Sequence, residues 1–208
     1  MTGGDRTPTP GPAPTSARIR PTAAEIDEAV LDVTAGLLAR RGVRDTSVQA
    51  VADATGYSKT GLLGRFPTKE RLVAAALDQC VRLTRDVHER VDDVTAPRDR
   101  DAAAVAGLVD LALRRRGWAE LVLASVPPVA DATLEPALGD VFTLVSDLFR
   151  IDADTDLPRR ARVTGMLGAL VVLALTHERE TTAEVARPLV VTVCWSTLGH
   201  EGAVPSVP

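Results

Sequence analysis

Apolar residues recur every three or four positions along most of the chain, the period of an α-helix with one buried face. The first stripe consists of Ile26, Val30, Val33 and Leu37. Thr22 and Glu25 precede it with the spacing of a capping box, and Gly42 follows two arginines that suit a helix C-terminus. The pattern predicts a first helix of about 20 residues.

A second, shorter helix is predicted directly after it. Thr46 and Gln49 again have capping-box spacing, and the helix is expected to run to about Ala54. Gly56 is expected to end it, because a glycine tolerates the positive φ of a helix C-terminal cap.

The next polar caps predict two further helices. Ser58 is expected to cap a third helix that reaches Phe66, and Pro67 interrupts the chain. Thr68 is expected to cap a fourth helix, which carries an apolar stripe as far as Val91 and is expected to run to Val94.

The rest of the chain is also predicted to be helical. The candidate helices cover 100–116, 117–126, 132–150, 158–177 and 182–198. Pro188 lies within the last of them and implies a kink or a later start. Segments with a period of two are missing from the sequence, so no sheet is expected and the fold class is all-α.

Residues 1–20 differ in composition from the helical segments. They are rich in proline, glycine and threonine, and no Leu, Val or Ile precedes Ile19. Such a segment buries too little apolar surface to offset the entropy lost on ordering, so a disordered tail is predicted. Arg18 and Arg20 close it, either as a basic arm that reaches a polyanion or, as the simpler interpretation, as part of a solvated tail.

The composition is that of a globular protein, with 45% apolar and 25% charged residues and a formal charge of −4. Cys80 and Cys194 do not form a disulfide framework and fit a reducing interior. The N-terminus lacks the apolar core of a signal peptide, and the apolar run 163–175 is too short to span a bilayer. These observations predict a cytoplasmic protein without membrane attachment.

The most informative stretch is 46–66, TSVQAVADATGYSKTGLLGRF. The small Ala52 lies mid-helix, Gly56 follows four residues later, and Leu62 follows six residues after that. A helix-turn-helix uses this spacing, because its two helices cross closely and a tight turn joins them. The pattern alone occurs in many helical hairpins.

The distribution of charge supports the same interpretation. Lys59 and Lys69 are the only lysines of the chain, and both lie in or beside this stretch, where exposed cations can meet phosphates. Residues 1–71 carry a net charge of +2, whereas residues 72–208 carry −6.

The segment from about Ile26 to Leu77 resembles the DNA-binding domain of the TetR (tetracycline-repressor-like) family of bacterial regulators. The resemblance is carried by AVLDVTAGLLARRGVRDTSV, QAVADATGYSKTGLLGRF and PTKERLVAAAL. It implies a helix-turn-helix domain over 21–67, with the start of the fourth helix to about residue 77, and a helical regulatory and dimerisation domain over 68–208.

The resemblance also implies roles for individual positions. Residues at the start of the second helix would contact the DNA backbone, those at the start of the third helix would enter the major groove, and Lys69 would hold a phosphate. The candidate DNA-binding residues are Thr46, Ser47, Ser58, Lys59, Thr60, Gly61, Leu63, Arg65 and Lys69. The polar residues at the helix starts are expected to act as caps in either case.

The recognition helix departs from the family pattern. Thr60 and Gly61 stand in the reverse of the usual order, Leu63 replaces the usual tyrosine, and Gly64-Arg65 replaces the usual aromatic or histidine pair. The two glycines allow either a closer approach to DNA or a helix that orders only on binding. Arg65 is expected to bind phosphate or, alternatively, to read guanine.

The C-terminal helices, by the same resemblance, bind a ligand and form a homodimer. The helices predicted over 158–177 and 182–198 are apolar on more than one face, which suits a four-helix seam between two subunits or, alternatively, burial within one. Two-fold symmetry would require a pseudo-palindromic double-stranded operator.

The larger side chains among the central helices are candidate ligand-binding residues. These are Trp118, Phe142, Phe149 and Met166. They either line an apolar cavity or belong to the core. An apolar or amphipathic small-molecule effector is expected, because uncompensated charges are scarce on the apolar faces of these helices.

The sequence thus predicts a DNA-binding transcriptional regulator, a repressor by the family's common mode, with activation left open. Two alternatives are a helical small-molecule-binding module without operator binding, and an enzyme. No catalytic, metal-binding or cofactor-binding residues are predicted, because His88, His177 and His200 are scattered and the familiar nucleophile, zinc and nucleotide motifs are missing from the sequence.

Overall fold

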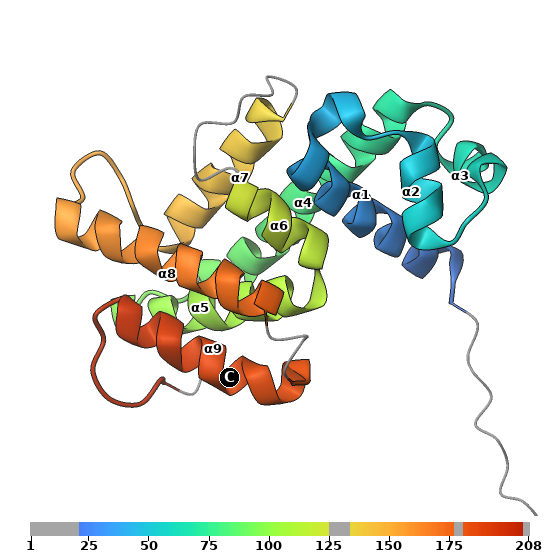
Figure 1. The fold of residues 1–208 in the computed structure, drawn as a ribbon. Helices are drawn as coiled ribbons and strands as arrows, with labels where there is room; N and C mark the ends of the chain where they lie inside the picture. Colours follow the sequence, from blue (N-terminus) through green and yellow to red (C-terminus); the bar gives the residue numbers. More distant parts are fainter. Residues whose placement is uncertain (1–20, 125–133, 177–180, 206–208) are drawn as a thin grey trace, which may run out of the picture.

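The described part of the chain, residues 21–124, 134–176 and 181–205 of a computed structural model, forms nine α-helices and no strand (Figure 1). The predicted all-α class is therefore confirmed. The tail predicted over residues 1–20 lies outside the described residues.

Helix α1 (Ala23–Asp45) begins as its sequence predicts. The Thr22 hydroxyl accepts a hydrogen bond from the Glu25 amide, and the Glu25 carboxylate accepts one from the Thr22 amide at 2.7 Å. Gly42, the expected stop, has a φ of 71° and a ψ of 173° and interrupts the helical path. Only a short segment follows it before α2 begins.

Helices α2 (Val48–Thr55) and α3 (Lys59–Arg65) form a compact pair. Ser47, and not the predicted Thr46, is the N-cap of α2, and its hydroxyl accepts from the Ala50 amide at 3.1 Å. Gly56 has a φ of 74° and closes α2 in the left-handed conformation, as predicted. The turn from Gly56 to Ser58 then starts α3.

Helix α4 (Lys69–Asp92) begins at the predicted cap, Thr68. The remaining helices are α5 (Pro97–Arg114), α6 (Arg116–Ala124), α7 (Glu135–Leu148), α8 (Leu157–Thr176) and α9 (Ala183–Thr197). Helix α5 starts three residues before its prediction, because Pro97 occupies its first turn, where its missing N–H costs no hydrogen bond. Helix α9 runs through Pro188, so the later start is wrong.

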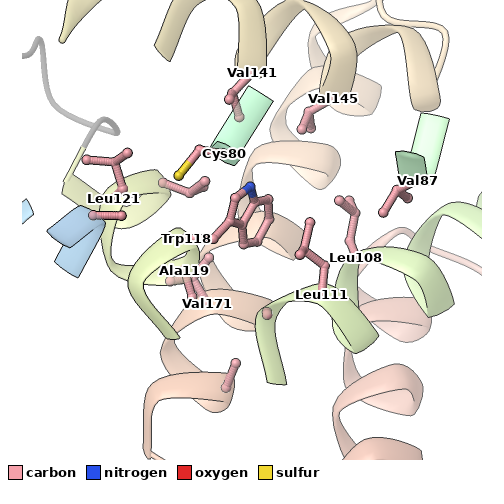
Figure 2. Packing of buried hydrophobic residues seen from close by; sticks show 14 of the residues in the cluster. Cys80, Val87, Leu108, Leu111, Trp118, Ala119, Leu121, Val141, Val145 and Val171 are labelled. Carbon is pink, nitrogen blue, oxygen red and sulfur yellow. The ribbon is translucent and has the colours of Figure 1, made fainter. Parts of the chain in front are cut away.

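The core is mainly aliphatic and surrounds Trp118. Figure 2 shows the Trp118 ring among side chains of α4, α5, α6 and α7, including Cys80, Leu108 and Val141. Its indole N–H donates to the Thr84 hydroxyl at 2.9 Å, so the one polar atom of the ring is satisfied inside the core. No helix in the described ranges has the length and apolarity needed to cross a bilayer.

Helices α2 and α3 lie at one end of the molecule, and α8 and α9 lie side by side at the other (Figure 1). Helix α1 connects the two parts, because it packs against α2 and α4 and most extensively against α6. The position of the α2–α3 pair is therefore set through the contacts of α1.

Candidate nucleic-acid interface

One face of helix α3 packs against the core, and the other face is exposed to solvent. Leu62 is 1% exposed and anchors the helix to the core, and Leu63 packs partly against the same cluster. Lys59, Thr60 and Gly61 at the start of the helix are exposed. An exposed first turn with a lysine and a hydroxyl is what a helix needs to enter a major groove.

Three helices begin close to this face, each with a hydroxyl cap. Ser47 begins α2, Ser58 begins α3 with an oxygen 3.0 Å from the Gly61 amide, and Thr68 begins α4 with an oxygen 3.2 Å from the Arg71 amide. All three side chains are exposed. Helix N-termini carry partial positive charge, so these starts suit phosphate groups.

Thr46 lies differently from its expected role. Its side chain is 1% exposed, and its hydroxyl donates to the Gly42 carbonyl at 2.8 Å. The hydroxyl closes the turn between α1 and α2 and does not face outward. The physical reason is the adjacent Ser47, which takes the cap and leaves Thr46 on the inner side of the turn.

Arg65 is held by α1. Its guanidinium forms an ion pair with Asp27 and donates to the Ala23 carbonyl at 3.2 Å. About a third of the side chain remains exposed. In this structure Arg65 therefore fixes the C-terminal end of α3 against the first turn of α1, and it does not extend from the exposed face.

Lys69 is half-buried at the start of α4, and its amine donates to the Arg44 carbonyl at 3.0 Å. A lysine amine has three donors, so this contact leaves two of them for a phosphate oxygen. The contact also aims the amine toward the end of α1.

Sequence reasoning missed Tyr57. It lies in the turn between α2 and α3, next to Ser58 and Lys59, and its side chain is 40% exposed. A large aromatic residue in a turn that otherwise presents small polar residues was the available signal. Its side chain is therefore accessible at the turn that leads into α3.

The four candidate ligand-binding residues separate into two groups. Trp118, Phe149 and Met166 are at most 2% exposed and belong to the core. Phe142 lines a cavity of about 260 Å³ between α6, α7 and α8. The other lining residues are Val122, Leu123, Thr164, Leu167, Gly168 and Val171. The cavity wall is thus apolar except for one hydroxyl.

Helices α8 and α9 expose large apolar side chains. These are Leu157, Val172, Val185 and Leu189. Single exposed apolar residues are common on protein surfaces, but these four all lie on two adjacent helices, with Leu157 at the start of α8 and Val172 about four turns further along it. The two helices bury their other faces against each other and α5.

Both cysteines are buried, and His200 is paired with a carboxylate. Burial raises the pKa of the Cys80 and Cys194 thiols to about 12, which leaves both neutral. His200 contacts the buried Asp101 carboxylate at 2.7 Å and stacks on Trp195. No group of three potential ligands within 21–124, 134–176 and 181–205 is arranged to hold a metal ion.

Residues 30–76, which span α2, α3 and the larger part of α1, match the family model of bacterial regulatory proteins of the tetR family. The match covers the residues that form the exposed α3 face. A search of curated protein sequences found no significant match.

Solved structures extend the likeness in fold to most of the chain. A TetR-like transcriptional regulator from Rhodococcus sp. RHA1 is 20% identical, with a TM-score of 0.53 over 88% of this chain and 100% of that one. The fatty acid degradation regulator FadR from Bacillus halodurans is 13% identical, with a TM-score of 0.53 over 88% and 100% of the two chains. The ketosteroid transcriptional regulator KstR2 of Mycobacterium tuberculosis is 18% identical, with a TM-score of 0.51 over 83% and 93%. Residues 30–76 thus match the TetR family, and the chain shares its fold with solved TetR-like regulators.

Proposed function

We propose that this protein is a TetR-family transcriptional repressor that binds a double-stranded operator and is released from it by a small molecule. The observation that carries the proposal is the solvent-exposed outer face of α3, within the segment that matches the family model. Its exposed Lys59 and Thr60 stand where a major-groove helix meets base edges.

The contacts divide by chemistry. Lys59 and Thr60 reach base edges, while the capped helix starts at Ser47 and Ser58 and the amine of Lys69 hold phosphates. Thr46 acts through the turn that it closes, and Arg65 acts by holding α3 against α1. The reading unit is the domain over 21–67 with the start of α4.

Two copies are needed to read a pseudo-palindromic site. The exposed apolar residues of α8 and α9 supply a seam on which a second copy would bury the same surface, giving a four-helix contact. The seam lies at the opposite end of the molecule from α3, so it leaves both reading helices free to face one duplex (Figure 1).

The effector occupies the cavity between α6, α7 and α8, with Phe142 as its largest wall residue. Its apolar wall suits an apolar or amphipathic molecule, and the Thr164 hydroxyl is the polar group that would orient it. Two lining residues, Val122 and Leu123, lie on α6, the helix that packs on α1. Binding would therefore shift α6 and, through α1, the distance between the two reading helices.

The protein acts in the cytoplasm, where the operator is, and it has no catalytic role. Both cysteines are buried and neutral, so neither is expected to act as a nucleophile. The region from residue 68 onward serves regulation and dimerisation.

A selection experiment tests this function. The full-length protein is incubated with a library of random-sequence duplexes, and the retained fragments are sequenced. We expect one pseudo-palindromic motif, with affinity that falls steeply as salt rises. Lys59→Ala should lower the affinity for the selected duplex, while Arg114→Ala, an exposed arginine at the end of α5, should not. Failure to enrich any motif would overturn the proposal.

A further inference from the structure

Gly64 lies on the exposed side of α3, and the fold does not require a glycine at this position. A Cβ built at this position meets nothing within 4 Å, and the backbone is not in the left-handed region that favours glycine. A glycine inside a helix is less favourable than alanine because it gives up more backbone entropy. The chain thus carries a destabilising residue in a short helix where alanine would fit.

The neighbouring residues keep the surface around Gly64 clear. Leu63 packs partly against the core, and Arg65 is drawn toward Asp27 and the Ala23 carbonyl. Gly61 differs, because its added Cβ would lie 3.0 Å from the capping Ser58 hydroxyl, so the cap itself disfavours a side chain there. The space next to the Gly64 backbone is open to solvent or to a binding partner.

We propose that Gly64 is an affinity-determining contact residue, at which the bare backbone of α3 lies directly against the floor of the operator's major groove. The inference rests on the proposed function, since it needs a duplex at this face. A methyl group at residue 64 would hold the helix away from the base edges and lengthen every contact made by Lys59 and Thr60. The glycine therefore exchanges stability of the fold for closeness to DNA.

The chain offers a matched control. Gly139 is also exposed inside a helix, α7, and a Cβ built there also meets nothing within 4 Å. Gly64→Ala and Gly139→Ala should therefore gain a similar amount of stability, about 2–4 °C in Tm each, from the same loss of unfolded-state entropy. Only the first lies on the α3 face.

The test compares the two variants and Gly64→Leu on the duplex that wild-type protein selects from a random library. Gly64→Ala should weaken binding about tenfold while raising Tm, Gly64→Leu should weaken it further, and Gly139→Ala should leave it unchanged. Unchanged affinity of Gly64→Ala on a duplex that wild type binds would overturn the inference alone. A lower Tm for Gly64→Ala would also overturn it, because the fold would then need the glycine. If wild type selects no duplex, the proposed function fails and the inference fails with it.

Discussion

Arg100 is a buried cation whose guanidinium hydrogen-bonds to backbone carbonyls. Its side chain is 6% exposed. The guanidinium donates to the carbonyls of Leu148 and Asp147 at the end of α7 and to those of Val91 and Asp92 at the end of α4. Helix C-termini carry partial negative charge, so one side chain satisfies and neutralises two helix ends at once.

We expect Arg100→Met to lower the free energy of unfolding by about 3 kcal/mol, because several carbonyls then lose their donor in the interior. Arg114→Met, on the exposed end of the same helix, should change it by less than about 0.5 kcal/mol. Urea denaturation of both variants measures the difference. Equal effects would contradict the capping role of Arg100.

Asp32 is a carboxylate of α1 that accepts hydrogen bonds from the amides of Gly117 and Trp118, at 3.1 and 3.3 Å. Burial raises the pKa of Asp32 above 3.8, the ordinary value for an aspartate. The two hydrogen bonds and the charge of Arg115 offset this rise only in part. A raised pKa means that the folded state binds the proton more tightly than the unfolded chain. The contribution of Asp32 to stability is therefore fully present below pH 3.8 and is lost as pH rises through the raised value.

Unfolding free energies of wild type and Asp32→Asn, measured between about pH 3 and pH 7, test this sign. The advantage of wild type over the variant should shrink as pH rises. Asp152→Asn serves as the opposite case, because the Thr155 hydroxyl lowers the pKa of Asp152 and the wild type should gain relative stability with rising pH. Parallel profiles for wild type and Asp32→Asn would contradict the assignment.

At the scale of helices, the backbones of α1 and α6 approach each other very closely. A Cβ at Gly117 would overlap the carbonyl of Asp32, so only glycine fits the start of α6. Ion pairs of Glu28 with Arg115 and of Arg40 with Glu120 flank this contact. The two helices are thus held together by backbone contact at the centre and by charge at the edges.

Gly117→Ala should push α6 away from α1 and lower the free energy of unfolding by about 1–3 kcal/mol. Gly165→Ala on α8 is the control, because its added Cβ would make an ordinary 3.6 Å contact with Thr197. Thermal unfolding of the two variants gives the comparison. A loss of the same size in both would mean that the close approach has no special cost.

The boundaries of most helices could be predicted from the sequence, because caps are local. Thr22 with Glu25, Ser58 and Thr68 all begin the helices that their spacing predicts. The exception is Thr46 beside Ser47, two adjacent hydroxyls that only the course of the chain after Gly42 can separate.

The candidate site could be predicted only in part. The exposed start of α3 follows from local spacing, but the fate of Arg65 depends on Asp27, 38 positions away. Side-chain size likewise did not distinguish Trp118, which is packed and hydrogen-bonded in the core, from Phe142 at the cavity. That difference depends on which helix faces pack together, and the local sequence does not show such long-range packing.

At the scale of the whole molecule, the exposed apolar residues of α8 and α9 predict the oligomeric state. Wild type should be a dimer, and Leu189→Glu, at a side chain that is 63% exposed, should give a monomer by light scattering at micromolar concentration. Tyr57→Glu replaces an exposed apolar residue at the opposite end and should remain dimeric. A dimer of Leu189→Glu would place the interface elsewhere.

The absence of a side chain at residue 117 has a consequence for how sequences of this kind can diverge. Since α1 and α6 touch backbone to backbone there, neither helix can drift without the other. A larger residue at the start of α6 would require a wider spacing between α1 and α6, and the α2–α3 pair, which packs on α1, would then lie at another angle. Enlargement of residue 117 should therefore occur together with changes on the facing side of α1, around Asp32 and Gly36.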